Sequence, residues 1–160
     1  MLELSVTKRG GSMRRKIGIL VTALLLAGLS DCAHAQEAVV GYEPAVVQLT
    51  GTVALERHYG PPGYGATPRM DKVLTVPVLV LANPVSVQGN PRNPRSQAQV
   101  DTGSFAHVSR MQMTAETPGL KLSSLSGEKV TVSGTLFQKA FGENFTDVLV
   151  SVRRVALAVQ

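Results

Sequence analysis

Two segments of the chain alternate apolar and polar residues and place a glycine on the apolar side. In KVTVSGTLF (129–137), three apolar residues and Gly134 share one face of a two-residue period. VQLTGTVAL (47–55) repeats the arrangement around Gly51. A glycine at an inward position of a strand typically marks a bend or a bulge. We therefore expect two half-buried strands that bend at these glycines, as in a small sheet coiled into a barrel.

The same pattern predicts five main strands along the chain. They are expected at 45–58, 73–81, 105–114, 129–139 and 146–159. Pro77 indicates an edge or an interruption of the second strand. Asn83-Pro84 is interpreted as a turn into a short extra strand at 85–88, and residues 36–44 as a flexible lead-in. In the last strand the apolar positions change parity at Arg153-Arg154, which predicts a bulge.

A short helix is expected between the third and fourth strands. Thr117-Pro118 supplies an N-cap and a first-turn proline, leucines follow, and Gly127 is a stop signal. Five strands with one helix in this place are typical of the OB-fold. The sequence therefore predicts a mainly β protein, a small OB-like five-stranded Greek-key barrel, as one domain over 45–160.

The OB-fold binds ligands on its second and third strands and on the loops that join strands 1–2 and 4–5. Here these loops are expected at 59–68 and 140–145, and they hold four of the seven aromatic residues. Two alternatives remain open: the loop rings can pack on their own loops, and the two phenylalanines can cap the barrel end as core. The candidate ligand-binding residues are His58, Tyr59, Tyr64, Arg69, Phe141, Asn144 and Phe145.

Residues 1–35 have the pattern of a secretory signal peptide. Basic residues at 13–16 precede an apolar run at 17–29, which is short for a membrane span, and Ala33-His34-Ala35 forms an A-x-A cleavage site. We expect cleavage after Ala35 and a periplasmic or secreted protein. Translation could begin at Met13 instead of Met1.

Cys32 raises the alternative of a lipoprotein. A lipobox requires a small residue before the cysteine, and Asp31 stands there, so this pattern argues against lipid anchoring. The remainder of the chain has no cysteine, so a disulfide is excluded there.

The basic charge of the chain belongs mostly to its leader. Five of the 16 basic residues and two of the 11 acidic residues precede residue 36, which leaves a net charge of +2 for the rest. OB barrels often bind nucleic acid through aromatic residues in a basic groove, but export and this weak charge argue against it. The expected partner is an envelope component or a protein, of unknown identity.

Three segments together resemble a known family. YEPAVVQLTGTV (42–53), YGPPGYG (59–65) and LSGEKVTVSGTLF (125–137) are similar to an uncharacterised family of exported bacterial proteins, a domain of unknown function, over most of 42–152. The resemblance implies no activity. Family members often carry a histidine-rich stretch after G-T-L-F, whereas this chain has AFGENFTDV, so a metal role is not transferred.

Catalytic patterns are weak in this sequence. Val100-Asp101-Thr102-Gly103-Ser104 matches the aspartic-peptidase motif, which would require a homodimer because a second aspartate must share the proton. A loop sequence precedes the motif, so an Asp-Thr-Gly turn is the competing interpretation. His58 and His107 do not have metal-ligand spacing, and no cofactor is expected.

These observations favour a non-enzymatic binding module of the cell envelope. The alternatives are an aspartic-type peptidase built on Asp101 and a purely structural envelope protein without a ligand surface.

Overall fold

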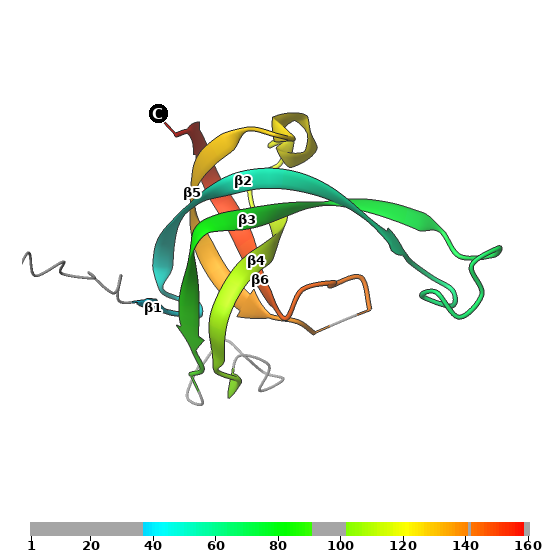
Figure 1. Cartoon of the computed structure of the whole chain (residues 1–160), viewed down its shortest axis with the longest axis horizontal. Helices are drawn as coiled ribbons and strands as arrows, with labels where there is room; N and C mark the ends of the chain where they lie inside the picture. The colour runs from blue at the N-terminus through cyan, green and yellow to red at the C-terminus, as the bar shows by residue number, and fades with distance from the viewer. Residues whose placement is uncertain (1–36, 91–101, 141, 159–160) are drawn as a thin grey trace, which may run out of the picture. The chain divides into compact units, whose positions relative to one another are not determined.

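Five strands form a closed ring within the residues that the structure describes. The structure is a computed structural model, and it describes residues 37–90, 102–140 and 142–158. Strand β2 pairs antiparallel with β3 and β5, β3 with β4, and β5 with β6, while a parallel pairing of β4 with β6 closes the ring (Figure 1). The strands are β2 (Val46–Tyr59), β3 (Val73–Gln88), β4 (Phe105–Ala115), β5 (Lys129–Gln138) and β6 (Val148–Leu157).

The ring order is β2-β3-β4-β6-β5, and the helical segment lies between β4 and β5. Because β5 precedes β6 in the chain but lies beside β2, the connections follow a Greek-key path. This is the strand plan of an OB-like barrel. The expected fold class, a mainly β five-stranded barrel, is confirmed.

The two inward glycines allow neighbouring strands to approach closely. A Cβ atom built on Gly51 would lie 2.3 Å from the carbonyl oxygen of Val80, and one on Gly134 would lie 2.0 Å from that of Ser151. No side chain fits at such distances, so both strands need glycine where the neighbouring backbone approaches this closely. The expectation that Gly51 and Gly134 mark special positions in the strands of a coiled barrel is confirmed.

Aliphatic side chains fill the barrel. The residues that share a face with the two glycines are buried as far as Val53 in β2 and through Leu136 in β5, as their pattern predicts. The burial expected at Leu55 is wrong, because this residue is 39% exposed on the projecting hairpin. The fully buried core includes Val53, Leu79, Met111, Val130, Val132, Leu136, Val150 and Val152.

The change of parity in β6 corresponds to a β-bulge. Ser133 of β5 lies opposite Arg154, whereas the next residue, Gly134, lies opposite Val152. Arg153 is therefore the extra residue, and the predicted bulge is confirmed. The bulge lets Val150 and Val152 before it and Val155 after it point to the same face of the sheet, toward the core, despite their different parity.

The expected turn at Asn83-Pro84 is wrong. β3 runs from Val73 to Gln88 without interruption, and the two prolines in it are accommodated in different ways. Pro77 lies opposite Leu55 of β2, just beyond the part of β3 that pairs with β4. Pro84 lies in an irregular stretch between the pairs Val80–Arg110 and Val85–Val108, where a proline displaces no ladder hydrogen bond.

The flexible lead-in expected at 36–44 contains a strand. Strand β1 (Ala38–Gly41) pairs parallel with β3, in a register that sets Ala38 opposite Val85. A strand of four residues carries too little alternation to be recognised from its sequence. Tyr42, which follows it, is buried against the core.

The helix between β4 and β5 is shorter than predicted. A 3-10 helix, η2 (Leu122–Leu125), follows Lys121 as N-cap, so the expected start at Thr117-Pro118 is wrong. The predicted stop is correct, because Gly127 has a positive φ of 85° just after the helix. Within the described residues, no helix has the length and hydrophobicity that crossing a bilayer requires.

The β2–β3 hairpin extends beyond the rest of the sheet. Pairing of β2 with β5 ends at Thr52–Lys129, and pairing of β4 with β3 ends at Gln112–Val78. From there to Tyr59–Val73 the two strands pair only with each other, and Figure 1 shows this hairpin leading away from the other strands. Its tip is the first of the two loops that the sequence singles out.

Candidate functional site

A buried carboxylate organises the β2–β3 loop (60–72). Oδ1 of Asp71 accepts hydrogen bonds from the Gly63 N–H at 2.7 Å and the Thr67 hydroxyl at 2.9 Å. Its Oδ2 accepts from the N–H groups of Gly65 at 2.8 Å and Thr67 at 3.2 Å. Tyr64 and Gly65 have positive φ angles, which turn successive N–H groups inward. The loop therefore folds around one side chain, although it has no regular structure.

The protonation of Asp71 reflects this environment. Removal from water acts to raise the pKa of the carboxyl group, but the hydrogen bonds from Gly65, Thr67 and Gly63 outweigh it and hold the pKa below its ordinary value. The charged form is thus the one that holds the loop together.

A buried carboxamide has the same role in the β5–β6 loop (139–140 and 142–147). The side chain of Gln112 on β4 accepts a hydrogen bond from the Phe145 N–H at 2.8 Å and donates one to the Glu143 carbonyl at 3.2 Å. The Gln112 N–H donates to the Thr146 hydroxyl at 2.8 Å. These bonds hold the loop against the outer face of the barrel, where it covers Gln112.

The two loops lie against each other at two points. The ring of His58, at the end of β2, stacks on Phe145 with a centroid separation of 4.1 Å and an interplanar angle of 9°. The ring of Tyr64 packs on the backbone of Gly142, where a Cβ atom would lie 2.7 Å from Cζ. The structure thus brings the predicted residues His58 and Tyr64 into contact with the β5–β6 loop, at Phe145 and at Gly142 respectively.

An ion-pair network lies beside this contact. The carboxylate of Glu56 lies 3.3 Å from Nε2 of His58 through one oxygen and accepts a hydrogen bond from the guanidinium of Arg110 through the other. Glu56 and His58 share one face of β2, and Arg110 is on β4. The network therefore links the projecting hairpin to the barrel.

The remaining predicted residues have different positions. Tyr59 and Tyr64 are 46% and 48% exposed, and Arg69 is exposed in a shallow hollow with Thr67, Pro68 and Met70. Asn144 is half-buried in the β5–β6 loop. Phe141 lies outside the described residues.

A groove of about 280 Å³ runs beside the stacked pair. It is lined by residues 105–110 of β4 and residues 145–148. His107 and Arg110 contribute to one side and Asp147 to the other. The groove lies on the third barrel strand next to the loop between the fourth and fifth strands, which is where OB-folds bind ligands.

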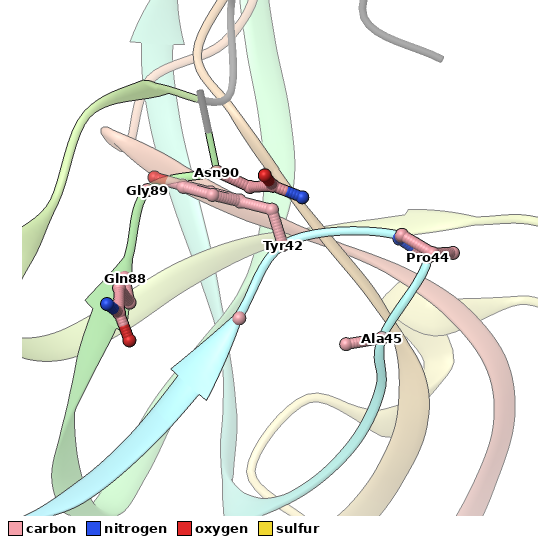
Figure 2. Close-up of a pocket in the computed structure, with 7 residues that line it drawn as sticks. Tyr42, Pro44, Ala45, Gln88, Gly89 and Asn90 are labelled. Carbon is pink, nitrogen blue, oxygen red and sulfur yellow. The ribbon is translucent and has the colours of Figure 1, made fainter. Parts of the chain in front are cut away.

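A second cavity, of about 440 Å³, lies at the far end of β3 from the β2–β3 loop. Its lining includes Tyr42, Gln88 and Asn90, and Figure 2 shows the Tyr42 ring extending from the end of β1 toward Gly89 and Asn90. Among the described residues that line it, Tyr42 is the ionisable one.

Asp101 of the peptidase motif lies outside the described residues, so that hypothesis stays a prediction. The two residues that end the motif are bonded to neighbouring elements. The Gly103 N–H donates to Oε1 of Gln138 at 3.0 Å, and the Ser104 hydroxyl accepts from the Gly89 N–H at 2.9 Å. Among the described residues, no group of three or more His, Cys, Asp or Glu side chains is arranged to hold a metal ion.

Residues 110–156 match a protein family described as a domain of unknown function (DUF4431). The matched stretch begins within β4, continues through β5 and ends within β6, so it covers the β5–β6 loop but not the β2–β3 loop. No curated protein and no solved structure matches the chain. The similarity, over less than half of the chain, agrees with the expected domain of unknown function and transfers no activity.

Sequence reasoning missed the two residues that hold the loops. Gln112 lies between inward-facing Met111 and Met113, so alternation predicts that it faces solvent. Only the fold places a loop over it. Asp71 ends a Gly/Pro-rich loop, and aspartate commonly accepts hydrogen bonds from nearby backbone N–H groups, so its sequence position carried a usable signal.

Proposed function

We propose that the chain is an exported bacterial binding module, without enzymatic activity, whose ligand surface is the β2–β3 loop together with the β5–β6 loop. The partner is a protein or another component of the cell envelope. The signal-peptide pattern at 1–35 supports export to the periplasm or beyond. The domain-of-unknown-function match is compatible with this role and adds no chemistry.

The observation that carries the proposal is the meeting of two separately fixed loops. Asp71 and Gln112 each satisfy several backbone groups of one loop, so the loops keep their form without a ligand. A surface that is ordered in advance loses less entropy on binding. Tyr59 and Tyr64 then supply exposed rings, and Arg69 an exposed cation, around this fixed base.

The rings divide into two functional groups. His58 and Phe145 stack on each other, so each ring already has one face covered within the molecule, and the pair holds the loops together. Tyr59 and Tyr64 remain about half exposed and are the groups available for stacking on a ligand. Asn144 supplies a polar contact beside the groove.

Photo-crosslinking tests the proposal. A photoreactive phenylalanine analogue in place of Tyr64 is expected to crosslink one defined component of an envelope extract, identified by mass spectrometry. Competition by the unlabelled chain should abolish the product, and competition by its Tyr59→Ala variant should be weaker. The same analogue at Leu157, an exposed residue of β6, is the control. Equal products from both positions, or none from Tyr64, would remove the loop surface as the binding site.

A purely structural role is the second candidate. The stacking of His58 on Phe145 favours it, because these rings are already used within the molecule. On that view the loop contact stiffens the hairpin, and alanine at Tyr59 and Tyr64 leaves every envelope interaction unchanged.

A further inference from the structure

The projecting part of the β2–β3 hairpin has two edges without a neighbouring strand. On the β2 side, the last backbone bonds to the β5 region are made by Val53, whose N–H donates to Glu128 at 3.0 Å and whose carbonyl accepts from Gly127 at 2.8 Å. On the β3 side, pairing with β4 ends at Val78. Beyond these points, every second residue of each strand directs its backbone N–H and C=O groups outward, along the edge of the hairpin.

On β2 these outward groups belong to Leu55, Arg57 and Tyr59. Backbone direction alternates along a strand, so residues with the parity of Val53 point away from β3. The opposite parity points toward β3, as the bond from the Gly60 N–H to the Lys72 carbonyl at 2.7 Å demonstrates. Within the described residues, the N–H and C=O groups of the three outward residues have no backbone partner.

The β3 edge is different because Pro77 interrupts it. The outward residues there have the parity of Leu79, which makes them Val73, Thr75 and Pro77. Proline has no N–H, and a proline on an edge strand prevents another strand from pairing there. The Lys72 N–H, next to this edge, is bonded to the Pro61 carbonyl. One edge of the hairpin is thus blocked and the other is open.

The side chains of the open edge define what pairs with it. Leu55, Arg57 and Tyr59 share one face of the strand, and Leu55 and Tyr59 are 39% and 46% exposed. Within the described residues, Arg57 forms no ion pair, whereas Glu56 on the opposite face is already bonded to Arg110 and His58. Because residues directly opposite in neighbouring strands interact most strongly, a complementary strand carries an apolar, an acidic and an apolar residue at alternate positions.

A second copy of the chain does not satisfy this pattern. A two-fold antiparallel pairing that uses all three outward residues must be centred on Arg57, with Leu55 opposite Tyr59. This register sets Arg57 directly opposite Arg57, and like charges in that position are destabilising. The open edge therefore suits a different partner.

We propose that the open edge of β2 binds an extended acidic peptide segment as an added strand, with the pattern apolar-x-Asp/Glu-x-apolar opposite Leu55, Arg57 and Tyr59. Backbone bonds provide the pairing, and the central carboxylate selects the register against Arg57. This inference names a partner class for the binding module proposed above and rests on that role, but it uses the strand edge instead of the loop surface.

Amide hydrogen exchange of the chain with a short synthetic peptide tests the inference. The peptide has aspartate at its centre, valine two residues to either side and threonine elsewhere. At saturation, the amides of Leu55, Arg57 and Tyr59 should exchange at least roughly tenfold more slowly, because each gains a bond. The amides of Glu56 and His58 are already bonded to β3 and should change little. Binding without this alternation, or no binding, would overturn the inference.

A charge exchange tests the register. Arg57→Glu should weaken binding of the aspartate peptide roughly threefold to tenfold and strengthen binding of a lysine-centred peptide by a similar factor. Arg154→Glu on β6 makes the same change of charge and should alter neither affinity. Arg57→Pro removes an outward N–H without removing a bond to β3, so it should abolish edge protection while the far-ultraviolet circular dichroism stays unchanged. Undiminished binding by the folded Arg57→Pro variant would refute pairing at this edge.

The outcomes also separate this inference from the loop surface. Alternating protection that persists without a Tyr64 crosslink supports the edge and refutes the loop proposal. A Tyr64 crosslink without alternating protection does the reverse. A chain that dimerises in sedimentation and protects the same amides without peptide would identify a second copy as the occupant and overturn the acidic-peptide partner.

Discussion

Alanine at Gly134 should destabilise the barrel strongly although it adds only one methyl group. The new Cβ would lie 2.0 Å from the carbonyl oxygen of Ser151 and 3.2 Å from the Cα of Val152, so backbone atoms must move. Overpacking of this kind costs about 3 kcal/mol. The reduced entropy of the unfolded alanine variant offsets about 0.5–1 kcal/mol of it. We expect a net loss of about 2 kcal/mol in the free energy of unfolding.

Urea unfolding followed by far-ultraviolet circular dichroism measures this loss, since the chain has no tryptophan for fluorescence. Gly41→Ala is the matched control, because its Cβ would find only the Cβ of Ala45, at 3.9 Å. That variant should unfold within about 0.5 kcal/mol of the unmodified chain. If Gly134→Ala were equally stable, the argument that close strand approach demands glycine would be wrong. A changed slope against urea would instead indicate an altered unfolded state.

Three further predictions concern the loops. The folded-state pKa of Asp71 lies below its ordinary value of 3.8, so its contribution to the stability of the β2–β3 loop is complete above pH 3.8 and is lost as the pH falls through the lower folded value. Protection of the loop amides, measured relative to their intrinsic exchange rates, should fall in that range of pH. Asp71→Asn should remove this pH dependence. Gln112→Leu should cost about 1–3 kcal/mol in urea unfolding by leaving two loop groups unbonded, whereas Gln48→Leu on the exposed face of β2 should be nearly neutral. A double-mutant cycle with His58→Ala and Phe145→Ala should give a coupling energy of about 0.5–1.5 kcal/mol, and a coupling of zero would contradict the stacked geometry.

Local patterns were sufficient for the barrel strands and their bends. Alternation located the five main strands, inward Gly51 and Gly134 indicated tight coiling, and the parity change at Arg153 identified the bulge. These features depend on residues close in sequence. Pro84 was misinterpreted because a proline ends a strand in most contexts, and only the register against β4 creates the irregular stretch that accepts it.

The candidate site was predictable only in outline. The strand order implied that the two loops would meet, and the contacts of Tyr64 with Gly142 and of His58 with Phe145 agree with it. Which rings stay exposed was not predictable, since it depends on how each loop is held. Gln112 acts on groups more than thirty positions away, and no local pattern carries that information.

The placement of β6 has a consequence for how the protein is made. β6 occupies the gap between β4 and β5, which leaves both of those strands with an open side until it arrives. A nascent chain that has not yet supplied residues 148–157 therefore cannot complete the barrel, and its exposed strand sides invite association with other chains. Closure depends on contacts between distant parts of the sequence, which form slowly. The barrel can close only after β6 has been synthesised, late in the described part of the chain.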